Sequence, residues 1–454
     1  MRYLSPGLCV VILMCLVSGP FAQSWTTTAD QSMKLSRKPL SIKRIQQDAA
    51  ISVIQINPQQ TYQTIEGFGF TLTGGSATLI NRLPAARRKQ LLHELFGRSR
   101  GGMAISSLRI SMGASDLSST VFTYDDIPAN TTDFGLAKFS LSEDTIDLIP
   151  LLKQIISINP SVKITASPWT PPLWMKDNKS SIGGKLLPSC YGVYADYFVK
   201  YIRAMKEQGI TIDAVTIQNE PQNPHNNPSL LMDAEEQKIF VKNHLGPAFR
   251  KSALETRIII WDHNADMPEY PMHILSDPEA AQYVDGTAFH LYAGNIGALS
   301  VVHDAHPSKN IYFTEQWTGK NGTFDGDLQW HIRNVVIGSM RNWSKNALEW
   351  NLANDTAYGP HTPGGCSECK GALTISGNNI ARNVSYYVIA HASRFVPQGS
   401  IRIGSQEVEG LSNVAFLTPS GKIVVIVLNE TDRVITPTLQ VGKRAAIQFL
   451  PAKS

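Results

Sequence analysis

The sequence carries little net charge of either sign. Its formal net charge is +4 over 454 residues, and lysine and arginine are scattered rather than clustered. A protein that binds nucleic acid is expected to carry a basic patch or stripe, so we predict no nucleic-acid partner. Hydrophobic residues make up 43% of the chain and charged residues 17%, which excludes a disordered chain and indicates a globular protein.

Long hydrophobic runs are also missing. No segment after the N-terminus has the roughly 18 uninterrupted apolar residues of a membrane-spanning helix. The N-terminus itself has a basic Arg2, an apolar stretch at residues 8–17 and a small residue at Ala22, which is the pattern of a secretory signal peptide. We therefore predict that residues 1–22 are removed and that the mature protein is secreted or periplasmic, with no integral membrane span.

Cysteine is scarce. Of the five cysteines, Cys9 and Cys15 fall in the leader, which leaves Cys190, Cys366 and Cys369. A redox-active Cys-X-X-Cys pair needs a strand-to-helix context that this glycine-rich segment lacks, and a zinc site needs further ligands nearby. A structural disulfide between Cys366 and Cys369 is the favoured interpretation for an exported protein.

From Ile65 onward, short apolar runs alternate with longer amphipathic patterns. Eight runs are typical of strands, and they begin at Gly67, Ser107, Lys163, Ala214, Arg257, Asp285, Asn310 and Ala347. Helical patterns between them cover residues 76–95, 143–156, 192–207, 234–245 and 328–340. Eight strands separated by helices predict an α/β fold of the (β/α)8 TIM-barrel type. The alternative is a doubly wound open sheet, which usually carries a glycine-rich turn after its first strand, whereas here Gly67 and Gly69 lie inside a run.

The two ends of the chain differ from the middle. After about Ser393 the sequence contains only short strand-like runs with turn residues, and residues 51–58 are also strand-like. We predict an all-β sandwich from residues 23–65 and 393–454, joined to a catalytic barrel at residues 66–392.

Two of the predicted barrel strands end in a glutamate. The fourth run ends in Asn219-Glu220-Pro221, and the seventh ends in Glu315-Gln316-Trp317. One glutamate at a strand end is most often an exposed loop carboxylate, and an Asn-Glu-Pro tripeptide alone is a weak signal. The C-terminal strand ends of a TIM barrel form the active-site floor, however, and strands four and seven lie nearly opposite one another. The pair therefore predicts the two carboxylates of a retaining glycosidase.

Several motifs, taken in order, resemble glycoside hydrolase family 30, which includes glucosylceramidases and β-1,6-glucanases. The resemblance runs from about Ile65 to Ile403. Its motifs are Gly67-Phe68-Gly69, Leu108-Arg109-Ile110, Ser115-Asp116-Leu117-Ser118, Ser167-Pro168-Trp169-Thr170-Pro171-Pro172, Asn219-Glu220-Pro221, Phe289-His290-Leu291-Tyr292, Thr314-Glu315, Glu349-Trp350-Asn351 and Ser393-Arg394-Phe395-Val396-Pro397. The family fold is a barrel joined to a β-sandwich formed from both termini, as expected above.

The resemblance implies a role for each matched residue. Glu220 would be the acid/base, with a raised pKa, and Glu315 the nucleophile, which must stay ionised. Asn219 would hold the sugar 2-hydroxyl. The other implied substrate-binding residues are Arg109, Asp116, Trp169, His290, Tyr292 and Trp350. For Arg109 and His290, supporting the catalytic groups and contacting sugar directly both stay open. No cofactor or metal is implied.

The sequence departs from the glucosylceramidase pattern in several places, Gly74-Gly75 in the first loop among them, and two of these departures bear on the substrate. Leu291 stands where those enzymes have tryptophan, and the loop from Tyr358 to Cys369 is more similar to glucanase-type and bacterial members. We therefore expect a monomeric hydrolase of β-D-glucosidic bonds, acting on a β-glucan such as β-1,6-glucan or on a glycolipid such as glucosylceramide. The alternatives are a β-xylosidase-like or β-fucosidase-like activity, or a non-catalytic carbohydrate-binding barrel, which should have lost a carboxylate.

Overall fold

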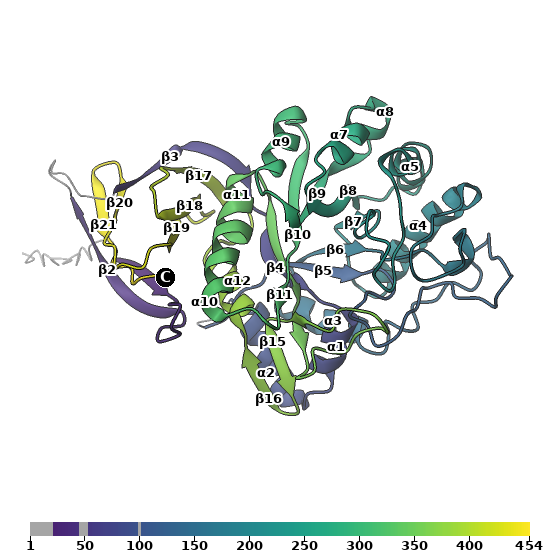
Figure 1. Ribbon diagram of the computed structural model, residues 1–454, viewed down its shortest axis with the longest axis horizontal. Helices are drawn as coiled ribbons and strands as arrows, with labels where there is room; N and C mark the ends of the chain where they lie inside the picture. Colours follow the sequence, from purple (N-terminus) through teal and green to yellow (C-terminus); the bar gives the residue numbers. More distant parts are fainter. Residues whose placement is uncertain (1–20, 45–52, 99–100) are drawn as a thin grey trace, which may run out of the picture.

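The computed structural model describes residues 21–44, 53–98 and 101–454 (Figure 1). The predicted leader lies outside these residues except for Phe21 and Ala22, which begin strand β1 (Phe21–Thr26). Within the described ranges, no helix is both long enough and apolar enough to cross a membrane.

All eight predicted barrel strands form, in the predicted order. They are β4 (Gly67–Thr71), β5 (Ser107–Ser111), β6 (Lys163–Ser167), β7 (Ala214–Thr216), β8 (Arg257–Ala265), β9 (Val284–Gly294), β10 (Asn310–Glu315) and β12 (Asn346–Asn351). Each strand pairs in parallel with its neighbour, from β12 and β4 round to β9 and β10. A parallel bridge between Ile311 and Ser344 links β10 to the segment just before β12. The ring therefore closes, and the open-sheet alternative is wrong.

The barrel strands are buried on both faces, which explains why they are continuous apolar runs in the sequence. Every residue of β4 and of β5 is buried. The two strands approach so closely at Gly69 that a Cβ there would lie 1.8 Å from the carbonyl oxygen of Ser107. Only glycine fits at this position, which is the structural basis of the Gly67-Phe68-Gly69 motif.

Helices surround the barrel (Figure 1). They are α1 (Gly74–Asn81), α2 (Ala85–Phe96), α3 (Leu148–Ile158), α4 (Tyr191–Glu207), α5 (Ala234–Phe240), α6 (Gly246–Lys251), α7 (Glu269–Leu275), α8 (Pro278–Ala281), α9 (Ala298–Ala305), α10 (Phe324–His331), α11 (Ser339–Arg341) and α12 (Val384–Ser393). Short 3-10 turns cover Leu173–Met175 and Pro188–Cys190, and π-helical turns cover Val241–Leu245 and Ile332–Gly338.

Two of the predicted helices differ from those observed because of proline. The pattern at residues 76–95 is two helices, since Pro84 disfavours helical backbone in the residue before it and becomes the N-cap of α2. The pattern at 143–156 begins only at Leu148. This start places Pro150 in the first turn of α3, where its missing N–H group leaves no hydrogen bond unmade.

A second sheet is built from both ends of the chain, in the order β1-β2-β21-β20-β3-β17-β18-β19. Its other strands are β2 (Ser36–Arg44), β3 (Val53–Thr64), β17 (Ile401–Ser405), β18 (Leu411–Leu417), β19 (Ile423–Asn429), β20 (Thr438–Val441) and β21 (Arg444–Ile447). A separate apolar core lies beside it, formed by Ile54, Ile56, Ile403, Leu411, Ala415 and Leu450. The predicted accessory β-domain with strands from both termini is thus present.

Short strands complete two small sheets beside the barrel. They are β11 (Thr318–Gly319) with β14 (Cys369–Lys370), and β13 (Ala353–Asn354) with β15 (Leu373–Ser376) and β16 (Asn379–Arg382). The first pair joins the segment after β10 to the segment after β12, which places the cysteine-containing turn beside the loop that follows Glu315.

Candidate active site

Glu220 and Glu315 come together at the carboxyl ends of β7 and β10. Their exposed fractions are 6% and 5%, and one carboxylate oxygen of each lies within 4.8 Å of the other and of a ring nitrogen of His290. Retaining glycosidases hold their two carboxyl groups about 5–5.5 Å apart, whereas inverting enzymes need about 6.5–9.5 Å to admit a water molecule. The spacing therefore fits a double displacement through a covalent intermediate.

The backbone at Glu220 is held in an unusual conformation. Its φ of 47° lies in the left-handed region, and its N–H group donates to the carbonyl oxygen of Asp262 at 3.0 Å. The side chain is held as well, because the amides of Asn223 and Asn226 donate to Oε2 of Glu220 at 2.8 and 3.2 Å. These two asparagines were not predicted from the sequence, since their contact with Glu220 depends on the path of the loop after β7.

Glu315 is held by two donors. Nη1 of Arg109 donates to Oε2 at 2.6 Å, and the hydroxyl of Tyr292 donates to Oε1 at 2.8 Å. Nη2 of Arg109 also donates to Oδ1 of Asn219 at 2.6 Å, and the guanidinium lies 4.8 Å from the ring centre of Trp169. Because Arg109 is completely buried, the geometry favours a role in orienting Glu315 and Asn219 over direct contact with sugar.

Asp262 is a central residue of the site that was not predicted. Its carboxylate accepts hydrogen bonds from the side chains of Arg109, Ser167, Thr216, His290 and Thr314. It lies within β8, where positive φ values at Trp261 and Asp262 accompany a shift of register against β9. In the sequence, the strand-like run that begins at Arg257 ends in Asp262, and this carboxylate at the end of a run was the available signal for a site residue. The irregularity that turns this side chain inward has no clear signature in the sequence.

His290 lies between the carboxylates of Glu220 and Asp262. Its Nδ1 is 3.3 Å from Oε1 of Glu220, and its Nε2 is 3.2 Å from Oδ1 of Asp262. Burial alone would lower the pKa of His290, but the charge of Glu315 and the hydrogen bonds to Asp262 and Glu220 outweigh burial and raise this pKa to about 9. The imidazole is therefore a cation at neutral pH, buried and held between two carboxylates.

The two glutamates differ in pKa in the direction opposite to the sequence-based expectation. Burial raises the pKa of Glu220, but the hydrogen bond and charge of His290 oppose it and bring this pKa to about 2. The pKa of Glu315 is raised, chiefly by burial, against the opposing effects of His290 and Arg109. The expectation of a raised pKa for Glu220 was wrong, because the hydrogen bond and charge of His290 stabilise the Glu220 carboxylate.

Aromatic residues and Asp116 lie on another side of the site. Trp169 and Trp350 pack with their ring centres 5.5 Å apart, in an apolar cluster with Leu117 and Cys369. The Asp116 carboxyl is buried, and burial together with the charges of Glu315 and Glu220 raises its pKa to about 7. The sequence thus correctly grouped Asp116 and the two tryptophans near the glutamates.

Tyr292 and Glu349 differ in their relation to the site. Tyr292 is 37% exposed while its hydroxyl contacts Glu315, so the ring is accessible from solvent beside the nucleophile candidate. Glu349, which precedes Trp350, instead forms a buried 2.7 Å pair with His331 of α10. Glu349 therefore belongs to the Glu349-Trp350-Asn351 motif because it packs β12 against α10.

Glu220, His290 and Glu315 are also spaced so that a metal ion could bridge them. A metal-binding histidine must be neutral, however, and His290 has a pKa of about 9. Arg109 already neutralises Glu315 at 2.6 Å. Charge balance in this cluster is thus supplied by Arg109 and His290, and the residues fit a metal ion poorly.

Comparisons with known proteins agree on one family. Residues 65–396 match the profile described as the glycosyl hydrolase family 30 TIM-barrel domain, and residues 399–454 match the family 30 beta sandwich domain. The endo-1,6-beta-D-glucanase neg1 of Aspergillus fumigatus is 34% identical over 411 residues, covering 84% of this chain and 82% of that protein. The lysosomal acid glucosylceramidase of Mus musculus is 29% identical over 449 residues, covering 93% and 85%. Among solved structures, the endo-beta1,6-glucanase BT3312 superposes with a TM-score of 0.89 at 36% identity, covering 95% of this chain and 97% of that one.

Proposed function

Because this chain belongs to glycosyl hydrolase family 30 and is a hydrolase of β-glucosidic bonds, we propose that it acts with retention of configuration, through Glu315 as nucleophile and Glu220 as acid/base. The observation that carries the proposal is the pair of buried carboxylates within 4.8 Å of one another. A carbohydrate-binding barrel without catalysis has no need to keep two such groups at this spacing.

In the first step, Oε1 or Oε2 of Glu315 attacks the anomeric carbon while Glu220 gives a proton to the departing glycosidic oxygen. In the second step, Glu220 takes a proton from water, and the water oxygen displaces Glu315 from the sugar. Arg109 and Tyr292 orient the Glu315 carboxylate for attack from 2.6 and 2.8 Å. Oδ1 of Asn219 accepts a hydrogen bond from Arg109, which leaves the amide N–H groups of Asn219 for the sugar 2-hydroxyl.

The remaining sugar contacts fall to residues around the glutamates. Asp116 is proposed to bind hydroxyls on the side of the ring away from the scissile bond, with Trp169 and Trp350 forming the apolar surface beside it. Tyr292 lines the site next to Glu315. Neither Arg109 nor His290 is proposed to contact sugar, since both side chains are fully buried, and Arg109 acts as a positioning residue.

We propose further that His290 stores the proton that Glu220 donates. Its Nδ1 lies 3.3 Å from Oε1 of Glu220, so the proton can cross one hydrogen bond when substrate displaces water from the site. Activity on natural substrate should then be lost as pH rises through the pKa of His290, about 9, because the Glu220–His290 pair loses its only acidic proton.

A His290→Gln variant tests this proton store. Without the imidazolium, Glu220 itself must carry the proton that it donates. A carboxylic acid loses its proton at lower pH than an imidazolium does, so the alkaline limb of the kcat/KM profile should shift to lower pH. The measurement is a pH profile with a glucan substrate, beside an aryl glucoside that needs no proton from Glu220. An active variant whose alkaline limb stays in place would contradict the proposal.

Retention predicts the anomer that is released first. Proton NMR during the first minutes of hydrolysis should show the β-anomer of the new reducing end before mutarotation mixes the signals. Immediate appearance of the α-anomer would exclude a covalent intermediate on Glu315.

For substrate, we propose a β-1,6-linked glucan. Support comes from the Aspergillus fumigatus and Neurospora crassa endo-1,6-beta-D-glucanases, at 34% and 32% identity, and from the BT3312 structure at 36%. Glucosylceramidase relatives are 28–30% identical, and Leu291 replaces the tryptophan of their pattern. The xylanase structures, at 22% identity or less, share the fold alone.

A hydrolysis panel tests this choice. It compares β-1,6-glucan, β-1,3-glucan, xylan, an aryl β-glucoside and glucosylceramide in detergent micelles, by initial rates at equal enzyme concentration. We expect kcat/KM for β-1,6-glucan to exceed that for the other natural substrates by at least about tenfold. A preference for glucosylceramide would assign the glycolipid instead.

We also propose that the enzyme acts outside the cytoplasm. The Cys366–Cys369 disulfide persists in oxidising compartments, and the leader-like N-terminus agrees with export.

A further inference from the structure

The turn closed by Cys366 and Cys369 contacts the loop that carries Asp116. The N–H group of Thr362 donates to the Asp116 carbonyl oxygen at 2.9 Å, and the Cys366 side chain packs against the apolar cluster that includes Leu117, the next residue of that loop. A Cβ on Gly365 would lie 2.3 Å from the same carbonyl oxygen, so the two backbones touch. The backbone at Asp116, from which its side chain projects, is therefore held by residues 362–366.

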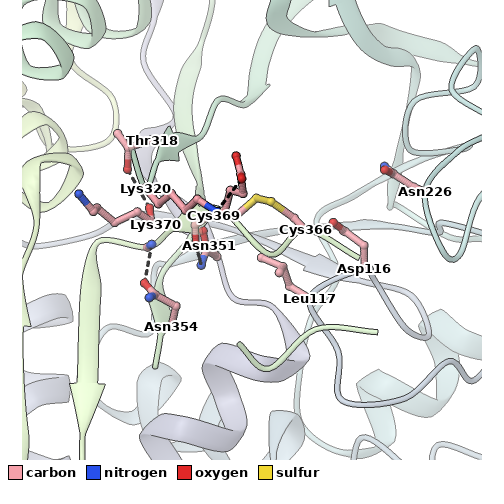
Figure 2. Close-up of a disulfide and its surroundings, with 12 residues drawn as sticks. Asp116, Leu117, Asn226, Thr318, Lys320, Asn351, Asn354, Cys366, Cys369 and Lys370 are labelled. Carbon is pink, nitrogen blue, oxygen red and sulfur yellow. Dashed lines mark hydrogen bonds and ion pairs between the residues drawn. A yellow bond between two sulfur atoms is a disulfide. The ribbon is translucent and has the colours of Figure 1, made fainter. Parts of the chain in front are cut away.

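The other end of the turn is fixed to the loop after Glu315. Strand β14, which includes Cys369, pairs with β11, and Thr318 donates to the carbonyl oxygen of Lys370 at 2.7 Å. The ammonium of Lys320 lies 2.7 Å from the carboxylate of Glu368. Figure 2 shows the disulfide between Asp116 and Leu117 on one side and the β11–β14 pair on the other.

The disulfide is the covalent link between these two ends. Cys369 is anchored in the β11–β14 pair, and Cys366 directly follows Gly365, whose backbone touches that of Asp116. Only Ser367 and Glu368 lie between them, so opening the bond frees little chain entropy and should cost little global stability. It would, however, let Gly365 and Cys366 move away from the loop that carries Asp116.

We propose that the Cys366–Cys369 disulfide is a positioning device for substrate binding, which fixes Asp116 relative to Glu315 by joining the Asp116 loop to the strand pair after Glu315. This inference rests on the proposed function, because it takes Asp116 as a sugar-binding residue. Its ligand is the glucose unit on the non-reducing side of the scissile bond, which Asp116 recognises through hydroxyl groups.

A double-mutant cycle with Asp116 tests the proposal. The disulfide is removed by Cys366→Ala with Cys369→Ala, and both the parent enzyme and an Asp116→Ala variant receive the change. In the parent, KM for β-glucan should rise about tenfold with kcat little changed, the size of one weakened hydrogen bond to a charged group. In the Asp116→Ala background, the same change should have almost no further effect on KM.

Two more variants distinguish a loss of Asp116 positioning from a general loss of stability. Gly365→Ala keeps both cysteines but pushes the turn away from Asp116, so it should reproduce the rise in KM. Ser367→Ala changes an exposed residue of the same turn and should leave KM unchanged. Melting temperature is measured for every variant, and binding of a glucose-configured iminosugar is measured by calorimetry.

The outcomes are distinct. Equal effects of disulfide removal in the parent and in Asp116→Ala, or a large fall in melting temperature with unchanged KM, would overturn the positioning role. If the unmutated enzyme neither hydrolyses β-glucans nor binds the iminosugar, the proposed function itself fails.

Discussion

Glu315→Gln is expected to reduce turnover of every β-glucoside by at least about 10⁴-fold, because no covalent glycosyl-enzyme can form without the carboxylate. The amide keeps the size of the side chain and can still accept a hydrogen bond from Tyr292 or Arg109. The loss should therefore fall on kcat, with folding preserved. An activated aryl glucoside should not restore activity, since a good leaving group does not replace the nucleophile.

Glu349→Gln is the matched control. Glu349 is also a buried glutamate on a barrel strand, but its carboxylate pairs with His331 rather than with the site. This variant should keep most of the activity and change mainly stability. Similar losses in the two variants, or aryl-glucosidase activity in Glu315→Gln, would remove Glu315 from the nucleophile role.

Glu220→Ala is expected to show a dependence on the leaving group. Hydrolysis of glucan should fall about 10²–10⁴-fold, the usual contribution of general acid/base catalysis. With an activated aryl glucoside, the first turnover should stay fast because the departing phenolate needs no proton. Later turnovers should be slow because water still lacks a base. Stopped-flow release of the phenol should then show a burst equal to the enzyme concentration.

The control for Glu220→Ala is Asn226→Ala. Asn226 donates to Oε2 of Glu220 at 3.2 Å, so its loss should weaken the orientation of the acid without removing it. A smaller fall in glucan hydrolysis and no burst are expected. Full glucan activity in Glu220→Ala would reject the assignment.

The barrel could be predicted from the sequence because parallel strands buried on both faces are uninterrupted apolar runs. Glu220 and Glu315 could be predicted because each ends such a run. Asp262 was missed because a backbone irregularity inside β8, rather than a strand end, turns it inward. The pKa order of the glutamates could not be predicted either. This order depends on the distances from His290 to the carboxylates around it, and these distances cannot be read from the spacing of residues along the chain.

The sheet shared by both termini determines the order in which the protein can fold. Strand β3 pairs with β17 and β20, and β2 pairs with β21, so almost the whole barrel sequence separates these partners. During synthesis, β3 must wait for the last part of the chain before its edges are covered. A ribosome that stops after the barrel would release a chain with an unpaired twelve-residue strand, which is an aggregation hazard. Synthesis of the C-terminal strands therefore covers both edges of β3 and removes this hazard.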